Sequence, residues 1–105
     1  MIVRTWRGRA AVGKASAYAE HFRHKVLPEL KSIAGFQGAT LLREDRAEDS
    51  EFLVLTRWAN LEAVRAFAGQ ALQHAVMEPE AVAALLNFDP TVQHYELVLE
   101  YQRPL

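Results

Sequence analysis

Two residues near the start of the chain combine a cation and a large aromatic ring. Arg4 and Trp6 are two residues apart, so on a strand both side chains would point to the same face. A guanidinium at that place could stabilise an anionic oxygen while the indole stacks on an aromatic ligand. The alternative is a packed tryptophan covered by the aliphatic stem of the arginine. Because a central strand rarely carries an arginine without a use for it, both are candidate pocket residues.

Two histidines are candidates for proton transfer, since imidazole ionises near neutral pH. His94 lies in a late apolar segment and could accept the proton of a phenol, although a hydrogen-bonded structural role is the favoured interpretation. His74 follows a glycine at the expected end of a helix, where its side chain could line a pocket or lie exposed. Neither position carries a motif that assigns a reaction.

A second pair of histidines raises the question of a metal site. His21 and His24 lie three residues apart in the run EHFRH, and two histidines on one helical face can ligate a metal. A site needs further ligands, for which the sequence offers no clear residue, and the HExxH spacing is absent. The sequence therefore predicts a solvated helical face here and no metal. Nucleotide-binding and hydrolase motifs are also absent, so no cofactor is expected.

The composition is that of one ordinary domain. The chain has 105 residues, of which 50% are hydrophobic and 24% charged, and residues 1–105 are expected to form a single domain. There is no cysteine, which excludes disulfides, thiolate nucleophiles and cysteine-ligated metals. The net charge of −1 gives no indication of a nucleic-acid or membrane partner. Apolar stretches too short to span a bilayer and a charged beginning make a cytoplasmic protein the expectation.

The hydropathy pattern predicts the elements that would position these side chains. Alternation predicts strands over 1–9, 36–43 and 51–58 and a long final strand over 91–101. Apolar residues at helical spacing predict a helix over 13–34, irregular at Pro28 and ended by Gly35, and a second helix after Asn60. Gly69 would interrupt that helix before it resumes at 71–72, and a short helix would follow over 80–86, before a turn at 87–90. The order βαββαβ predicts an α+β, ferredoxin-like fold whose four-stranded antiparallel sheet has the order 4-1-3-2.

Two of these strands are apolar on both faces. In the third strand Phe52, Val54 and Trp58 oppose Leu53 and Leu55, and the last strand shows the same tendency. Helices can cover only one face of the sheet, and a large apolar face is rarely left to water. The sequence therefore predicts a homodimer that packs sheet to sheet, without telling which strand face meets the partner.

The chain as a whole resembles the antibiotic biosynthesis monooxygenase (ABM) family. The resemblance lies in the segments MIVRTWRGR, VLPELKSIAGFQGATLLR, EFLVLTRWANLEAVRAFAG and VQHYEL. It implies a dimeric α/β barrel in which two such sheets close on each other and each protomer holds a ligand between sheet and helices. The family includes cofactor-free oxygenases of polyphenols, haem-degrading enzymes and members without an established activity.

The haem-degrading branch of that family uses an asparagine on the first strand and a tryptophan and a histidine on the second helix. An ungapped comparison places Trp6, Phe67 and Val76 at these three positions. His74 lies two residues from the last of them. All three residues depart from the pattern, which argues against haem degradation of that type.

The resulting hypothesis is a cofactor-independent monooxygenase that acts on a small aromatic phenol or hydroquinone. The candidate catalytic residues are His94, His74 and Arg4, and the candidate substrate-binding residues are Trp6, Trp58 and Phe67. Core packing is the favoured role of Trp58. The alternative hypothesis is a non-catalytic dimer of the same fold that binds a small ligand or serves a structural role.

Overall fold

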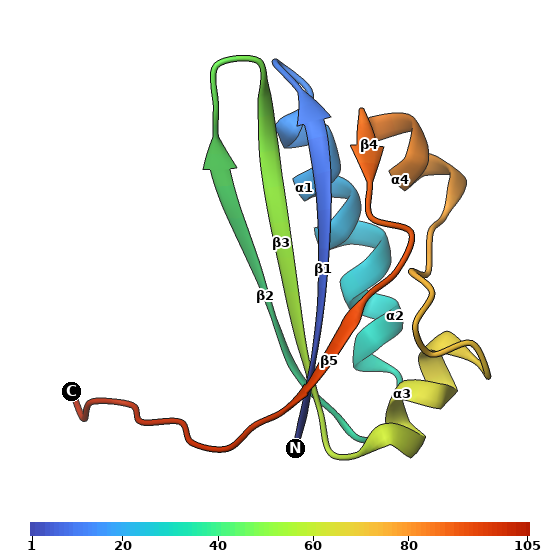
Figure 1. Cartoon of the computed structure of the whole chain (residues 1–105), viewed down its shortest axis with the longest axis vertical. Coiled ribbons are helices and arrows are strands. Elements are labelled where there is room, and N and C mark those ends of the chain that lie inside the picture. Colours follow the sequence, from blue (N-terminus) through green and yellow to red (C-terminus); the bar gives the residue numbers. More distant parts are fainter.

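The computed structural model describes all 105 residues and consists of an antiparallel sheet with helices packed on one face (Figure 1). Three ten-residue strands form its main part: β1 (Ile2–Ala11), β2 (Phe36–Asp45) and β3 (Asp49–Trp58). Two short strands, β4 (Asn87–Phe88) and β5 (Gln93–Glu96), both pair with the free edge of β1. The order β2-β3-β1, then β4 and β5, confirms the ferredoxin-like arrangement.

The helices connect these strands in the expected places. The first connection contains α1 (Ala15–His21), a π-helical turn η1 (Phe22–Val26) and α2 (Leu27–Lys31). The second contains α3 (Leu61–Ala68) and α4 (Pro79–Ala84). The side chain of Asn60 accepts a hydrogen bond of 3.0 Å from the backbone N–H of Ala63, which confirms the predicted N-cap of α3.

Pro28 shapes the first helical connection without ending it. Its nitrogen has no hydrogen to donate to the carbonyl of His24, and the irregularity appears as the π-helical turn η1 immediately before α2. The backbone stays right-handed where α1 meets η1 and where η1 meets α2. The predicted kink or restart is therefore a π-helical turn within a continuous helical connection. Gly35 then ends the connection at φ 91°, where a Cβ would lie 2.6 Å from that of Ala63.

Three sequence-based boundaries in the second half were wrong. The final strand ends at Glu96 instead of residue 101. The backbone N–H of Leu97 still donates to the carbonyl of Met1, but residues 98–105 leave the sheet and have no neighbouring strand in this chain (Figure 1). The helix predicted to resume at 71–72 does not form; the chain from 69 to 78 is irregular. Asn87 and Phe88, predicted as a turn, form β4 opposite Gly8 and Arg9.

The two faces of the sheet differ in burial, and β3 shows it most clearly. Phe52, Val54 and Trp58 point toward the helices and are almost completely buried. Leu53 and Leu55 alternate with them on the other face and are only half-buried. The apolar face that the helices leave uncovered is therefore the one carrying Leu53 and Leu55.

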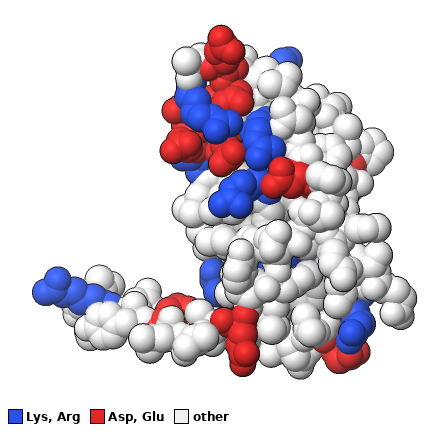
Figure 2. All heavy atoms as spheres, in the orientation of Figure 1, with Lys and Arg blue, Asp and Glu red and all other residues white.

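Many of the charged side chains lie at one end of the sheet (Figure 2). In the view of Figure 2, lysine, arginine and acidic side chains gather at the end of the sheet where β2 turns into β3, and the surface below them is largely uncoloured. The C-terminal tail, residues 98–105, projects away from the sheet and exposes Val98, Leu99 and Tyr101. None of the helices is long and apolar enough to cross a membrane.

Candidate functional site

An apolar cavity of about 70 Å³ lies between the sheet and the helices. Side chains from β1, β3, the first helical connection, α3 and the segment before α4 line it, and most of them are hydrophobic. The polar exceptions are few: Arg4, Thr56 and Tyr18 within the fold, and His21, Glu29 and Glu78 where α1, α2 and the segment before α4 meet. This is the combination of an apolar wall and a few polar groups that is typical of small-molecule sites.

Arg4 is a buried cation, only 5% exposed, near the start of β1. Its guanidinium donates hydrogen bonds to the carbonyls of Leu72 (2.7 Å) and His74 (2.9 Å) and lies above the ring of Phe67. Burial lowers the pKa of Arg4 to about 10, so the side chain still carries its charge at neutral pH. None of the ion pairs in the structure involves Arg4. The cavity wall thus contains a positive charge that no carboxylate neutralises.

Trp6 lies beside Arg4 on the same face of β1, as the spacing predicts. Its indole N–H donates to the carbonyl of Asp89 at 2.8 Å, and its ring lies over Gly8, where a Cβ would come within 2.5 Å of the indole. Tyr18 on α1 packs next to it, with ring centroids 6.0 Å apart. Burial raises the pKa of Tyr18, which keeps this phenol protonated and makes it a hydrogen-bond donor rather than a base.

His94 contacts Arg4 from the neighbouring strand. Its Nε2 lies 3.0 Å from Nη1 of Arg4, and because arginine has no acceptor, this nitrogen must accept. His94 is then neutral and carries its proton on Nδ1. Burial and the charge of Arg4 both lower its pKa. The lone pair that a general base would use is committed to Arg4, and His94 is not among the residues that line the cavity.

Two other candidate residues also lie outside the cavity lining. The side chain of His74 is exposed, and it is the backbone carbonyl of this residue that contacts Arg4. Trp58 is completely buried, donates to the hydroxyl of Thr56 at 2.8 Å and stacks on Phe67 at 5.7 Å, which fits a role in core packing. Of the six candidates, the structure thus brings three to the cavity: Arg4, Trp6 and Phe67.

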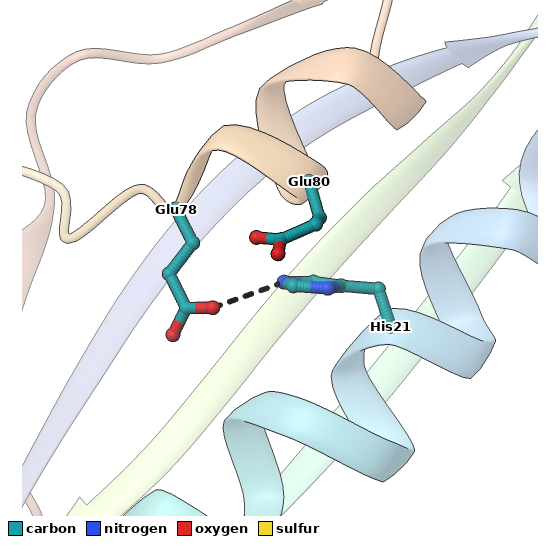
Figure 3. A group of neighbouring side chains, drawn as sticks. All are labelled: His21, Glu78 and Glu80. Carbon is teal, nitrogen blue, oxygen red and sulfur yellow. Dashed lines mark ion pairs between the residues drawn. The ribbon is translucent and has the colours of Figure 1, made fainter.

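His21 differs from the exposed pair that the sequence suggested. His24 is exposed and lies 2.9 Å from Glu20, one turn earlier on the same helix. His21 turns inward, and Figure 3 shows its ring pointing toward Glu78 and Glu80 at the start of α4. Burial and the neighbouring Glu78 raise the pKa of Glu29 next to this group. The sequence did contain a signal for His21, since it falls beside Tyr18 and Phe22 on the apolar stripe, but nothing that linked it to residues nearly sixty positions later.

The model of the antibiotic biosynthesis monooxygenase family matches residues 1–79, which is most of the chain. The chain belongs to this family. No curated protein sequence matches it.

Solved structures of similar fold cover nearly the full length of this ABM protein. The haem-degrading protein of Mycobacterium tuberculosis, with two haems in its active site, is 22% identical with a TM-score of 0.65, over 97% of this chain and 100% of the other. A cofactor-independent oxygenase of Streptomyces nogalater is 15% identical with a TM-score of 0.62, over 97% and 98%. A monooxygenase of Streptomyces coelicolor bound to nanaomycin D is 14% identical with a TM-score of 0.61, over 99% and 92%. At such identities the likeness establishes the fold.

The three positions compared with the haem-degrading branch all lie in the cavity wall of this ABM protein. Trp6, Phe67 and Val76 line the cavity, so a ligand bound there would contact all three side chains. Two large aromatic rings and a valine there supply neither an amide nor an imidazole. The departure from the haem-degrading pattern is therefore a property of the cavity itself.

Proposed function

We propose that this ABM protein is a cofactor-independent monooxygenase that oxidises a small phenol or hydroquinone in the cavity between sheet and helices. The observation that carries the proposal is Arg4, a buried guanidinium that lines an apolar cavity and has no carboxylate partner. An unneutralised buried cation favours an anionic ligand, and a phenolate combines a negative oxygen with a ring that fits apolar walls. Trp6 and Phe67 supply the aromatic surface for that ring.

In this proposal, Arg4 makes the chemistry possible by favouring the ionised phenol. A phenolate is far richer in electrons than a phenol, and this electron density is what allows it to react with molecular oxygen without a cofactor. The reaction balances without an external reductant: a ring C–H becomes a quinone carbonyl, one atom of O₂ enters the product and the other leaves as water. The oxygen is the electron acceptor. The phenolic proton passes to solvent, because the lone pair of His94 is occupied by Arg4.

Arg4 also couples ligand entry to the irregular segment from 69 to 78. A cavity of about 70 Å³ is smaller than the roughly 150 Å³ in which a benzene ring is accommodated, so a substrate must displace part of the wall. The wall nearest Arg4 is this segment, which it holds through the carbonyls of Leu72 and His74. A ligand oxygen that takes over some of these hydrogen bonds would release the segment as it binds.

Oxygen uptake against a panel of naphthols and hydroquinones tests the proposal. We expect consumption of one O₂ per quinone formed, with one ¹⁸O atom incorporated from ¹⁸O₂, and a loss of at least tenfold in rate for Arg4→Met. Arg23→Met is the matched control, since the side chain of Arg23 is exposed on the first helical connection and does not line the cavity. Ligand binding without oxygen uptake would instead support the non-catalytic alternative, which is favoured by the commitment of the His94 lone pair to Arg4.

We further propose that a second copy of the chain covers the open face of the sheet. Leu53 and Leu55 lie on that face, and the partly exposed Leu42 and Tyr95 extend it across β2 and β5. The C-terminal tail adds Val98, Leu99 and Tyr101, which contribute nothing to the core of their own chain. A sheet-to-sheet homodimer would bury both sets, as the dimeric barrel of the ABM family implies. Sedimentation at micromolar concentration should give twice the chain mass of 11.9 kDa.

A further inference from the structure

The cluster of His21, Glu78 and Glu80 lies at one end of the cavity and has no role in the proposed oxidation. One nitrogen of His21 and one carboxylate oxygen from each glutamate lie within 4.8 Å of one another. Figure 3 shows the imidazole reaching from α1 toward the two carboxylates, with Nε2 of His21 directed at Glu78. Nε2 of His21 lies 4.0 Å from Oε2 of Glu78.

His21 is the unusual member of the cluster. Its side chain is only 7% exposed, and its Nε2 is buried without a hydrogen-bond partner. It is the sole buried side-chain polar atom in the structure left in this state. An unsatisfied buried nitrogen costs free energy, and native structures keep such groups where a water, an ion or a ligand completes them. This nitrogen is directed toward the glutamates, where a bound species would complete it.

The glutamates are held in place by the start of α4. Pro79 begins the helix, which leaves Glu78 in an extended conformation and Glu80 in the first helical turn. Neither carboxylate is paired with a lysine or an arginine; the ion pair with His21 is the only one that either makes. Two carboxylates at this separation repel each other, and the structure provides no cationic side chain that is always charged to offset the repulsion. A bound cation would do so.

We propose that His21, Glu78 and Glu80 form a binding site for a divalent first-row transition metal ion such as Zn²⁺, Mn²⁺ or Co²⁺. Imidazole nitrogen with carboxylate oxygen suits these ions, whereas Mg²⁺ and Ca²⁺ prefer oxygen alone. Metal–ligand bonds of about 2.1 Å in tetrahedral geometry separate the ligand atoms by about 3.4 Å. The three ligand atoms therefore need to approach one another by roughly 1 Å, which rotations of the glutamate side chains can supply.

The site would join two parts of the molecule that otherwise meet only through packing. His21 belongs to α1 and the glutamates to the α4 region, so the ion would cross-link the helix that backs the cavity to the segment that covers it. Three protein ligands leave at least one coordination position for water or for an oxygen atom of a cavity ligand. Metal binding does not depend on the proposed oxidation, because it needs only the protein and the ion.

Titration of the untagged, EDTA-treated full-length protein with Co²⁺ tests the site. We expect one Co²⁺ per chain with visible d–d absorption, and a rise in Tm of roughly 10 °C at one hundred times Kd. His21→Gln and Glu80→Gln should each weaken binding at least tenfold; Glu80 is exposed, so its variant keeps the fold even if His21→Gln does not. His24→Gln, which removes an exposed histidine of the same helical connection, should leave the affinity unchanged.

Three results would overturn the inference. Absence of Co²⁺ binding at millimolar concentration would show that the cluster holds no metal and that His21 is only packed beside Glu78. Binding that His24→Gln abolishes and Glu80→Gln leaves intact would locate the ion on the exposed face. Equal affinity for Mg²⁺ would contradict a nitrogen ligand. Because no organic substrate is present in these titrations, their outcome is separate from that of the oxygen-uptake measurements.

Discussion

Replacement of Arg4 by methionine separates the two roles that the structure gives this residue. The substitution keeps the length and the apolar stem of the side chain but removes the charge and every hydrogen bond to Leu72, His74 and His94. Two backbone carbonyls lose a charged donor, at about 1–3 kcal/mol each, and part of that loss is offset because a guanidinium no longer has to be buried. We expect a net destabilisation of about 2–4 kcal/mol, which a domain of this size survives.

The effect on ligand ionisation is the more specific consequence. A phenolate oxygen about 4 Å from a guanidinium gains about 4 kcal/mol at an effective dielectric constant of 20, which corresponds to about three pKa units. The hydrogen bonds that Arg4 already makes compete for this interaction, so we expect the pKa of a bound phenol to fall by one to three units. In Arg4→Met the pKa of the bound phenol should return to its solution value or rise above it, since an apolar cavity disfavours the anion.

A nitrophenol provides the assay, because its absorption changes when it ionises. Titration of the bound nitrophenol over pH, in the native protein and in Arg4→Met, yields the two pKa values directly, and quenching of Trp6 fluorescence reports that the ring is bound. Arg23→Met should behave as the native protein. If the bound nitrophenol ionises at the same pH in the native protein and in Arg4→Met, Arg4 is a structural residue and the proposed stabilisation of a phenolate is refuted.

The other predictions concern the open sheet face, the tail and His94. Leu53→Lys should dissociate the dimer into folded monomers, seen by sedimentation, whereas Val54→Lys places a charge in the core and should unfold the chain by circular dichroism; the same outcome for both would contradict the assignment of faces. Removal of residues 98–105 should weaken dimerisation but leave the far-ultraviolet spectrum unchanged. Burial and Arg4 hold the pKa of His94 below its usual 6.5, so the unfolded chain binds more protons and stability falls as pH drops below that value. His94→Gln should flatten this decrease in Tm; a pH profile identical to that of the native protein would contradict it.

The elements with a strong periodic pattern were predicted closely from the sequence. The first strand, the β2–β3 hairpin and the start of α3 at Asn60 differ from their expected positions by a few residues at most. Alternation in β3 could not tell which face meets the helices, because both faces are apolar. The last strand was overestimated for the same reason: Val98, Leu99 and Tyr101 have the composition of a strand but no neighbouring strand in a single chain. The hydropathy pattern indicates that a segment is suited to pairing as a β-strand. Whether a neighbouring strand is present depends on the tertiary or quaternary structure.

The candidate site could also be predicted only where its residues are close together in the sequence. Arg4 and Trp6 were identified because both lie on one strand, where a spacing of two fixes their common face. The group of His21, Glu78 and Glu80 was missed because its members come from separate helices, and no local rule connects them. The sequence instead paired His21 with His24, although a helix directs residues three apart only roughly to one side; the apolar neighbours Tyr18 and Phe22 draw His21 inward and leave His24 in solvent. The useful signal was therefore a histidine within an apolar stripe, since a buried imidazole needs a partner for its nitrogen and this fold leaves Nε2 of His21 without one.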